Sequence, residues 1–316
     1  MNRRRLLQLG LGTAAVSALP RLLVQSSKAA TVAPAMKGAL ITKPIPSSGE
    51  RIPVVGIGTA RRYDNTTPEA RAEIKEVLRL YPTLGGKLID TAASYGEPLV
   101  GELVSELGNR EKLFLATKVG VGGRGGPGGK DAGLAQIERS FQRLRTNKID
   151  LIAVHNLGDT DTQLGTLRDL KSAGRIRYVG VTTSTDNQYE ALEAVMKSQK
   201  LDVVQVDFAI DNRNAAERIL PLAQDRGIAV MANLPFGRER LWNAVQGKPL
   251  PAWAAEFDCM SWAQFFLKYI VSHPAITCAI PGTARVKYVQ DNLQASHGRL
   301  PDAAMRTRME QFMAQH

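Results

Sequence analysis

Short runs of apolar residues alternate with longer segments of helical spacing along most of the chain. The runs are apolar on both faces, as in strands of a parallel sheet that is covered by helices. They occupy residues 54–58, 88–91, 113–119, 149–155, 178–182, 203–208, 228–234 and 278–281. The intervening segments carry apolar residues three and four positions apart, which predicts eight helices. Eight alternations of strand and helix predict an α/β fold, a (β/α)8 TIM barrel in a single domain.

Two features precede this alternation. Residues 39–58 read as an N-terminal β-hairpin with a Ser-Ser-Gly-Glu turn, which we expect to plug the bottom of the barrel. Residues 1–35 read as a signal peptide and short linker, because a basic start is followed by a short apolar stretch. The order Asn-Arg-Arg-Arg-Leu-Leu resembles a twin-arginine signal, with Arg3 and Arg4 as the pair. A basic tail, a general secretory signal and an uncleaved anchor are the alternatives.

This interpretation predicts that residues 36–316 form the mature domain and that the twin-arginine export machinery carries it, folded, to the periplasm or outside the cell. The apolar stretch is too short and too interrupted for a stable membrane span. The formal net charge is +11, and residues 1–30 contribute five basic residues and no acid. The remaining +6 is not arranged as a basic run with interleaved aromatics, so nucleic acid is not an expected partner. Two cysteines without metal-site spacing, Cys259 and Cys278, are expected to be separate buried thiols, with a single disulfide between them as the alternative.

Polar side chains stand at the ends of three consecutive predicted strands. Asp90 ends the second strand, and Tyr95 follows it in the connecting loop. Lys118 lies near the end of the third strand, and His155 ends the fourth. The carboxyl ends of barrel strands meet at one rim, which is where such folds place their chemistry. Each residue alone has an ordinary structural explanation, but the four together predict an active site.

The chemistry of this set is coherent. A tyrosine with a pKa near 10 is a poor acid at neutral pH, and a nearby ammonium lowers that pKa. We therefore expect Asp90 to hold Lys118, Lys118 to lower the pKa of Tyr95, and His155 to orient a carbonyl oxygen. Tyr95 would donate a proton to that oxygen as it becomes an alkoxide. No side chain supplies a hydride, so a nicotinamide cofactor is required.

These four residues, in "DTAASYG", "ATK" and "AVH", resemble the catalytic tetrad of the aldo/keto reductases. The segments "PVVGIGT", "GRIRYVGVT", "VVQVDF" and "AIPGTARVKYVQDNL" follow in the order of that family, so the similarity covers residues 40–295. The resemblance implies a (β/α)8 barrel that reduces an aldehyde or ketone to an alcohol with NADPH, or alternatively NADH, across the rim. The substrate is then a small carbonyl compound.

The resemblance also implies which residues bind the cofactor. Gln205 matches the glutamine that contacts the nicotinamide, whereas Thr182 and Thr183 replace the usual Ser-Asn pair, and Asn233 replaces a stacking tyrosine. The remaining expected cofactor residues are Gly58, Thr59, Leu234, Pro235, Phe236, Gly237, Pro281, Gly282, Thr283, Arg285, Lys287 and Asn292. Tyr288 stands where an arginine often binds the 2′-phosphate, so Arg285 or Lys287 would substitute for it. Ala60 replaces a substrate-pocket tryptophan, and residues 238–258 form either a lid or a packed surface loop.

Two other functions are compatible with a barrel of this kind. A Schiff-base aldolase would use Lys118 as its nucleophile but would leave the Asp90–Tyr95 spacing without a role. A non-catalytic, nucleotide-binding sensor or partner subunit would explain the substitutions at Asn233 and Tyr288. The glycine-rich segment 120–133 lacks the spacing of a phosphate-binding loop, and we expect a flexible loop at the rim.

Overall fold

Eight parallel strands form one sheet in the computed structural model, which describes residues 36–64, 67–122 and 128–315. The strands pair in chain order. They are β3 (Ile57–Gly58), β4 (Leu88–Asp90), β5 (Phe114–Val119), β6 (Ile149–His155), β7 (Ile176–Thr182), β8 (Val203–Asp207), β9 (Ala229–Asn233) and β10 (Ile276–Ala279). The predicted signal segment and residues 123–127 of the glycine-rich loop lie outside the described residues.

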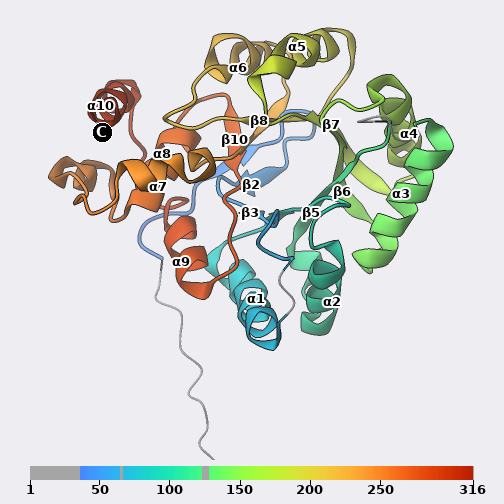
Figure 1. Ribbon diagram of the computed structural model, residues 1–316, viewed down its shortest axis with the longest axis horizontal. Coiled ribbons are helices and arrows are strands. Elements are labelled where there is room, and N and C mark those ends of the chain that lie inside the picture. The colour runs from blue at the N-terminus through green and yellow to red at the C-terminus, as the bar shows by residue number, and fades with distance from the viewer. Residues whose placement is uncertain (1–35, 65–66, 123–127, 316) are drawn as a thin grey trace, which may run out of the picture. The chain divides into compact units, whose positions relative to one another are not determined.

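The sheet closes on itself. Parallel bridges join Val55 to Ala279 and Gly58 to Gly282, so the segment around β3 pairs with the segment around β10. Figure 1 shows the strands arranged as a ring with helices outside it. The predicted (β/α)8 barrel is thereby confirmed, and the carboxyl ends of all eight strands face the same rim.

The described residues form ten α-helices. They are α1 (Pro68–Leu80), α2 (Glu97–Leu107), α3 (Lys130–Arg143), α4 (Thr160–Ser172), α5 (Tyr189–Ser198), α6 (Ala215–Asp225), α7 (Arg240–Ala244), α8 (Trp262–Val271), α9 (Val286–Gln294) and α10 (Ala303–Met313). Short 3₁₀ turns cover Tyr81–Leu84, Arg110–Lys112, Asp186–Gln188, Gly237–Glu239 and Ala252–Phe257. The eight predicted helices correspond to α1–α6, α8 and α9, while α7 and α10 are additional.

Local sequence signals fix several helix starts. The Thr67 side chain accepts a hydrogen bond from the Ala70 N–H at 3.3 Å, and Pro68 takes the first helical position of α1. The Asp302 carboxylate caps α10 in the same way, accepting from the Met305 N–H at 2.8 Å. These contacts satisfy N–H groups that have no partner within the helix.

An N-terminal hairpin closes the lower end of the barrel. It consists of β1 (Thr42–Pro44) and β2 (Arg51–Pro53), which pair antiparallel. Ile45 and Ile52 are almost fully buried and share a hydrophobic cluster with residues of the barrel strands, including Phe114. The predicted plug is therefore present, and it fills the lower barrel with apolar side chains.

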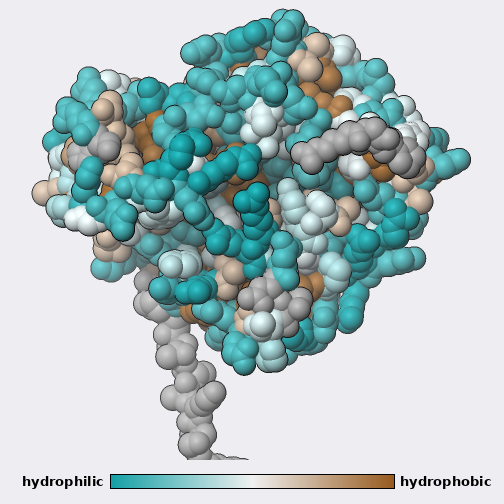
Figure 2. Space-filling view, viewed as in Figure 1, coloured by the Kyte–Doolittle hydropathy of each residue, from teal (hydrophilic) through white to brown (hydrophobic). Residues whose placement is uncertain are grey.

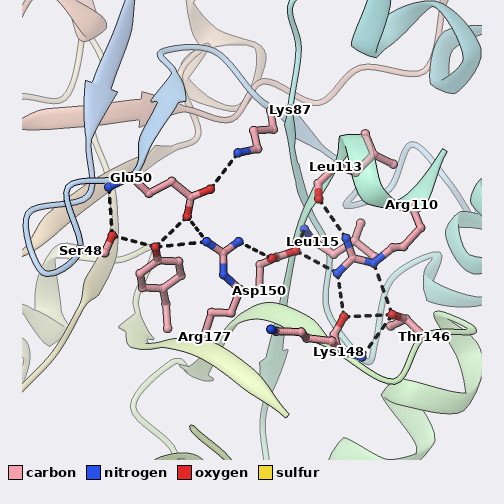
Figure 3. A network of polar contacts seen from close by, with 11 residues as sticks. Ser48, Glu50, Lys87, Arg110, Leu113, Leu115, Thr146, Lys148, Asp150 and Arg177 are labelled. Atoms are coloured by element: carbon pink, nitrogen blue, oxygen red, sulfur yellow. Dashed lines mark hydrogen bonds and ion pairs between the residues drawn. The ribbon is translucent and has the colours of Figure 1, made fainter. Parts of the chain in front are cut away.

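A network of ion pairs joins this hairpin to neighbouring strands (Figure 3). Glu50 accepts a hydrogen bond from Lys87 Nζ at 2.8 Å and also pairs with Arg177 of β7. Asp150 of β6 bridges Arg177 at 2.7 Å and Arg110 at 2.9 Å. Asp150 and Arg177 are the second residues of their strands, so the network lies at the end opposite the polar rim. Its role is to hold the hairpin to the sheet.

The start of the described chain is also tied to the end of α9 and the residues that follow it. The Lys37 N–H donates to Gln294 Oε1 at 3.0 Å, and the Ile41 N–H donates to the Ser296 carbonyl at 2.7 Å. Leu40 forms an antiparallel bridge with His297. The segment that leads into the hairpin is thus fixed by the residues that follow α9.

Several other features bear on the kind of protein this is. In the part of the chain that the structure describes, no helix has the length and apolarity to cross a bilayer. Within the same residues, no three His, Cys, Asp or Glu side chains are grouped to hold a metal ion.

Cys259 and Cys278 are buried free thiols, as expected. On the face shown in Figure 2, hydrophobic residues form only small, separate areas.

Candidate active site

A buried ion pair lies at the centre of the rim. Lys118 of β5 donates from Nζ to both carboxylate oxygens of Asp90 at 2.8 and 2.7 Å, and to the Thr91 carbonyl at 2.8 Å. Both side chains are more than nine-tenths buried. Because three acceptors surround the ammonium, its protons are engaged and no free amine is presented to a substrate. The geometry therefore gives no support to a Schiff-base role for Lys118.

The ion pair continues into a short chain of hydrogen bonds. Gln205 of β8 donates from Nε2 to Asp90 Oδ1 at 3.0 Å, and its Oε1 accepts from the Thr182 hydroxyl at 2.8 Å. Both partners lie at strand ends next to the cavity. The two contacts fix which way the Gln205 amide faces, since its donor and acceptor ends have different partners.

Tyr95 lies above this pair in the loop between β4 and α2. Its ring is half-buried and stands edge-on to His155, with centroids 6.0 Å apart and an interplanar angle of 89°. Lys118 Nζ lies 5.6 Å from the centroid of the tyrosine ring. Gly96 permits this placement, since a Cβ there would come within 2.5 Å of the Tyr63 Cβ on the neighbouring loop.

The pKa of Tyr95 differs from the value expected from the sequence. Burial raises the pKa of Tyr95, and the Asp90 carboxylate raises it further, while Arg238 and Arg61 lower it by less. The expected net lowering of the Tyr95 pKa is therefore wrong for this structure. The reason is that desolvation of the phenol, followed by the Asp90 charge, outweighs the charges of Arg238 and Arg61. Tyr95 is thus protonated at neutral pH, which is the form that can donate a proton.

His155 ends β6 beside Tyr95. Burial lowers the pKa of His155 to about 4, and the charge of Lys118 contributes in the same direction. The imidazole is therefore neutral near pH 7. A neutral ring has one N–H donor and one acceptor, so it can donate a hydrogen bond to a carbonyl oxygen without carrying charge.

Glu97 anchors the Tyr95 loop and was not singled out from the sequence. Its fully buried carboxylate accepts from the Thr117 hydroxyl at 2.6 Å, next to Lys118, and lies 3.5 Å from Arg143 NH1. Arg143 also donates to the Ala93 carbonyl in the loop at 3.1 Å. An acid in the first turn of a helix is ordinary, so no sequence signal distinguished this one.

These side chains surround a cavity of about 550 Å³ at the rim. Tyr95, Lys118 and His155 line it, whereas Asp90 lies behind Lys118. Of the residues expected to bind a cofactor, those that line the cavity are Gly58, Thr182, Gln205, Gly282 and residues 233–236. Ala60 also lines it, at the position where the family often has tryptophan.

The other expected cofactor residues lie outside the cavity lining. Those residues are Thr59, Thr183, Gly237, Pro281, Thr283, Arg285, Lys287 and Asn292. Thr59 donates its hydroxyl to the Asp90 carbonyl at 3.1 Å. Asn292 donates to the Thr283 hydroxyl at 2.9 Å, and this contact fixes the turn between β10 and α9. Arg285 and Lys287 are exposed at the start of α9.

Several cavity residues were missed by the sequence analysis. They are Arg61, Arg62, Asn156, Ser184 and Ile280, whereas Arg238 and Glu239, which also line the cavity, belong to the expected lid. All but Ile280 lie in loops that follow strands, and hydrophobic periodicity does not report where such loops run. Trp242 of the expected lid lines the cavity, whereas Trp253 packs on Phe257, Phe265 and Phe312 away from it. Only the first part of the segment 238–258 therefore borders the site.

One orphaned polar atom tests whether a nicotinamide fits this cavity. Asn233 donates from Nδ2 to the Thr183 carbonyl at 2.9 Å, but its buried Oδ1 has no partner among the described residues. A buried acceptor without a donor is costly. Because Asn233 lines the cavity, a carboxamide N–H from a ligand would satisfy it. The residues present thus suit the amide end of a nicotinamide cofactor.

The fold and this rim define a barrel oxidoreductase, and comparison with known proteins specifies its family. The profile of the aldo/keto reductase family matches residues 54–311, and the chain belongs to that family. The methylglyoxal reductase YeaE of Escherichia coli is 30% identical over 258 residues, 79% of this chain and 88% of that protein. The aldo-keto reductase YhdN of Bacillus subtilis is 32% identical over 167 residues, 49% of this chain and 50% of its own.

Solved structures share the same barrel. An aldo/keto reductase from Klebsiella pneumoniae, in complex with NADP and acetate, superposes with a TM-score of 0.73. It is 23% identical, and the match covers 87% of this chain and 96% of that one. The thermostable aldo-keto reductase Tm1743, in complex with the inhibitor epalrestat, is 25% identical with a TM-score of 0.71, covering 86% and 99%.

Proposed function

We propose that this protein reduces an aldehyde or ketone to an alcohol with NADPH as the hydride donor. The observation that carries the proposal is the meeting of a protonated Tyr95, a neutral His155 and the Asp90–Lys118 pair in one cavity. Membership of the aldo/keto reductase family and the NADP-bound relatives of known structure support it.

Each side chain has a defined part in this reaction. The nicotinamide, when bound, supplies the hydride that reaches the carbonyl carbon. His155 donates a hydrogen bond that orients the carbonyl oxygen, and Tyr95 gives its phenolic proton to that oxygen. Lys118 Nζ lies 5.6 Å from the centroid of the tyrosine ring, and its positive charge would stabilise the phenolate that remains. Asp90 and Thr91 hold the ammonium in place.

The same cavity wall supports a cofactor assignment. Gln205, Thr182 and the unsatisfied Asn233 oxygen would hold the nicotinamide amide, and residues 234–237 would lie along the diphosphate. Arg285 and Lys287 would bind a 2′-phosphate in place of the usual arginine. Tyr288, which replaces it, is 46% exposed and lies under Lys287 Nζ at 4.8 Å.

The first test is a fluorescence titration of the mature chain with NADPH and separately with NADH, followed by turnover of methylglyoxal. We expect NADPH to bind more tightly and to be consumed. Preference for NADH would keep the chemistry and change the cofactor. Tight binding without turnover of any aldehyde would favour the alternative, a nucleotide-binding sensor or partner subunit. Binding of neither nucleotide would contradict both.

We also propose that the chain is exported in folded form by the twin-arginine machinery, on the strength of Arg3 and Arg4 ahead of a short apolar stretch. Replacing both arginines by lysine should retain the protein in the cytoplasm, as measured by cell fractionation. Unchanged export of that variant would exclude a twin-arginine route.

A further inference from the structure

The charges around the cavity do not cancel. Four cationic side chains and one carboxylate line it, namely Arg61, Arg62, Lys118, Arg238 and Glu239. Asp90 neutralises Lys118, and Glu239 lies 3.9 Å from Arg62. Among the described residues, neither Arg61 nor Arg238 forms an ion pair. Two guanidinium groups at the cavity mouth are therefore left without an anion.

The charges of both guanidinium groups affect Tyr95, the proposed proton donor. Arg238 and Arg61 are the two cations that lower the pKa of Tyr95, against the opposing effects of burial, Asp90 and, more weakly, Asp64. Both arginines line the same cavity as Tyr95. An anionic group on a carbonyl compound bound in this cavity could therefore meet them.

Arg61 and Arg238 are exposed, and both lie in turns with a left-handed backbone. Arg61 and Arg238 have φ angles of 58° and 52°, a left-handed conformation that is uncommon for residues with a side chain. The Thr59 carbonyl accepts the N–H groups of Arg62 and Tyr63 at 3.0 and 3.1 Å, which closes the first turn. Strained backbone that its surroundings fix in place is concentrated at functional positions.

The turn that contains Arg238 is held by Asp211, in the loop that follows β8. Arg240 donates from Nε to Asp211 Oδ2 at 2.8 Å, so the residues beside Arg238 are fixed while Arg238 itself stays exposed. Gly237 has a φ of 60°, and a Cβ there would come within 2.4 Å of the same Asp211 oxygen. A side chain at this position would therefore clash with the Asp211 carboxylate that holds the turn.

We infer that the preferred carbonyl substrates carry an oxyanion, such as a carboxylate, and that Arg61 and Arg238 bind it. This inference rests on the proposed reductase function and specifies its substrate class. Guanidinium groups bind carboxylates through paired, charge-assisted hydrogen bonds. Phe236 and Trp242, whose ring centroids are 4.9 Å apart, supply an apolar wall for the rest of the substrate. The substrate class is therefore oxo acids with an apolar or aromatic middle.

Arg61 and Arg238 could instead bind the diphosphate of the cofactor. The experiment therefore distinguishes binding of a substrate carboxylate from binding of the cofactor diphosphate. We would measure kcat/KM for 4-carboxybenzaldehyde and its neutral analogue 4-formylbenzamide, together with the Kd of NADPH. The variants are Arg61→Gln, Arg238→Gln and the charge-conserving Arg61→Lys. Arg139→Gln is the control, because Arg139 is exposed on α3 and has no ion pair in the described chain.

We expect the wild-type protein to favour the carboxylate about tenfold, and each Gln variant to lower that ratio about five- to tenfold. Arg61→Lys should restore part of it, and added salt should shrink it, because the site is exposed. A ratio unchanged in both Gln variants, with a raised Kd for NADPH, would overturn the inference and assign the arginines to the cofactor.

Failure of the reductase function itself would look different. If neither aldehyde is turned over, isothermal titration of benzoate and benzamide into the NADPH complex still measures anion recognition. Benzoate binding that weakens at least fivefold in the Gln variants would support the site without the chemistry. Equal binding of benzoate and benzamide would refute the site.

Discussion

Replacing Tyr95 by phenylalanine should lower kcat for carbonyl reduction at least a hundredfold. A positioned general acid contributes about 10²- to 10⁴-fold to rate, and no other protonated hydroxyl group is assigned that role here. The Kd of NADPH should change less than twofold, because the ring and its contact with His155 remain. Steady-state kinetics with NADPH and fluorescence titration of the cofactor measure the two quantities.

The matched control is Tyr63→Phe. Tyr63 is fully buried beside Gly96, and its hydroxyl has no hydrogen-bond partner among the described residues. Removing that hydroxyl should leave kcat within a factor of two, since it forms no hydrogen bond with Asp90, Tyr95, Lys118 or His155. A Tyr95→Phe protein that kept more than a tenth of the wild-type kcat would show that the proton comes from elsewhere.

Replacing Lys118 by methionine should lower the free energy of unfolding by about 3–5 kcal/mol, because Asp90 then remains buried without its cation. The double variant Asp90→Asn with Lys118→Met should recover most of that loss, because both charges are removed together. Both proteins should be inactive, since neither carries an ammonium beside the Tyr95 ring. Urea unfolding and kcat measured on the same preparations separate stability from chemistry.

An exposed pair provides the comparison. Lys130 lies 2.8 Å from Asp169 at the start of α3, and both side chains are more than half exposed. Lys130→Met should therefore change the free energy of unfolding by less than about 1 kcal/mol. If the double variant at positions 90 and 118 were as unstable as Lys118→Met alone, the unpaired charge would not be the cause.

The strands were predictable because a parallel sheet leaves a strong signal. Its strands are buried on both faces, so each reads as an unbroken apolar run, and β6 begins and ends at the predicted residues. Asp90, Lys118 and His155 followed from that pattern, since strand ends meet at one rim. Helix α10 was missed because Met309 is its only buried residue, which leaves no apolar stripe to detect.

The rest of the site depends on contacts between segments far apart in the sequence. The course of the loops across the rim places Arg61 and Arg238 at the cavity. It also brings the Glu97 carboxylate to the Thr117 hydroxyl, with which it forms a buried hydrogen bond. The pKa of Tyr95 depends on burial, which sequence does not report. The predicted sign of that shift was wrong because desolvation of the phenol, its largest cause, outweighs the effect of nearby cations.

The tie between Lys37 and Gln294 bears on the order in which the molecule is completed. These residues are 257 positions apart, so the contact closes a very long loop and forms only when nearly the whole chain is available. A chain emerging from the ribosome can build its central strands well before this contact exists. The hydrogen bond that fixes Lys37 therefore forms late in synthesis. Until then, the backbone around Lys37 lacks this contact with the residues at the end of α9.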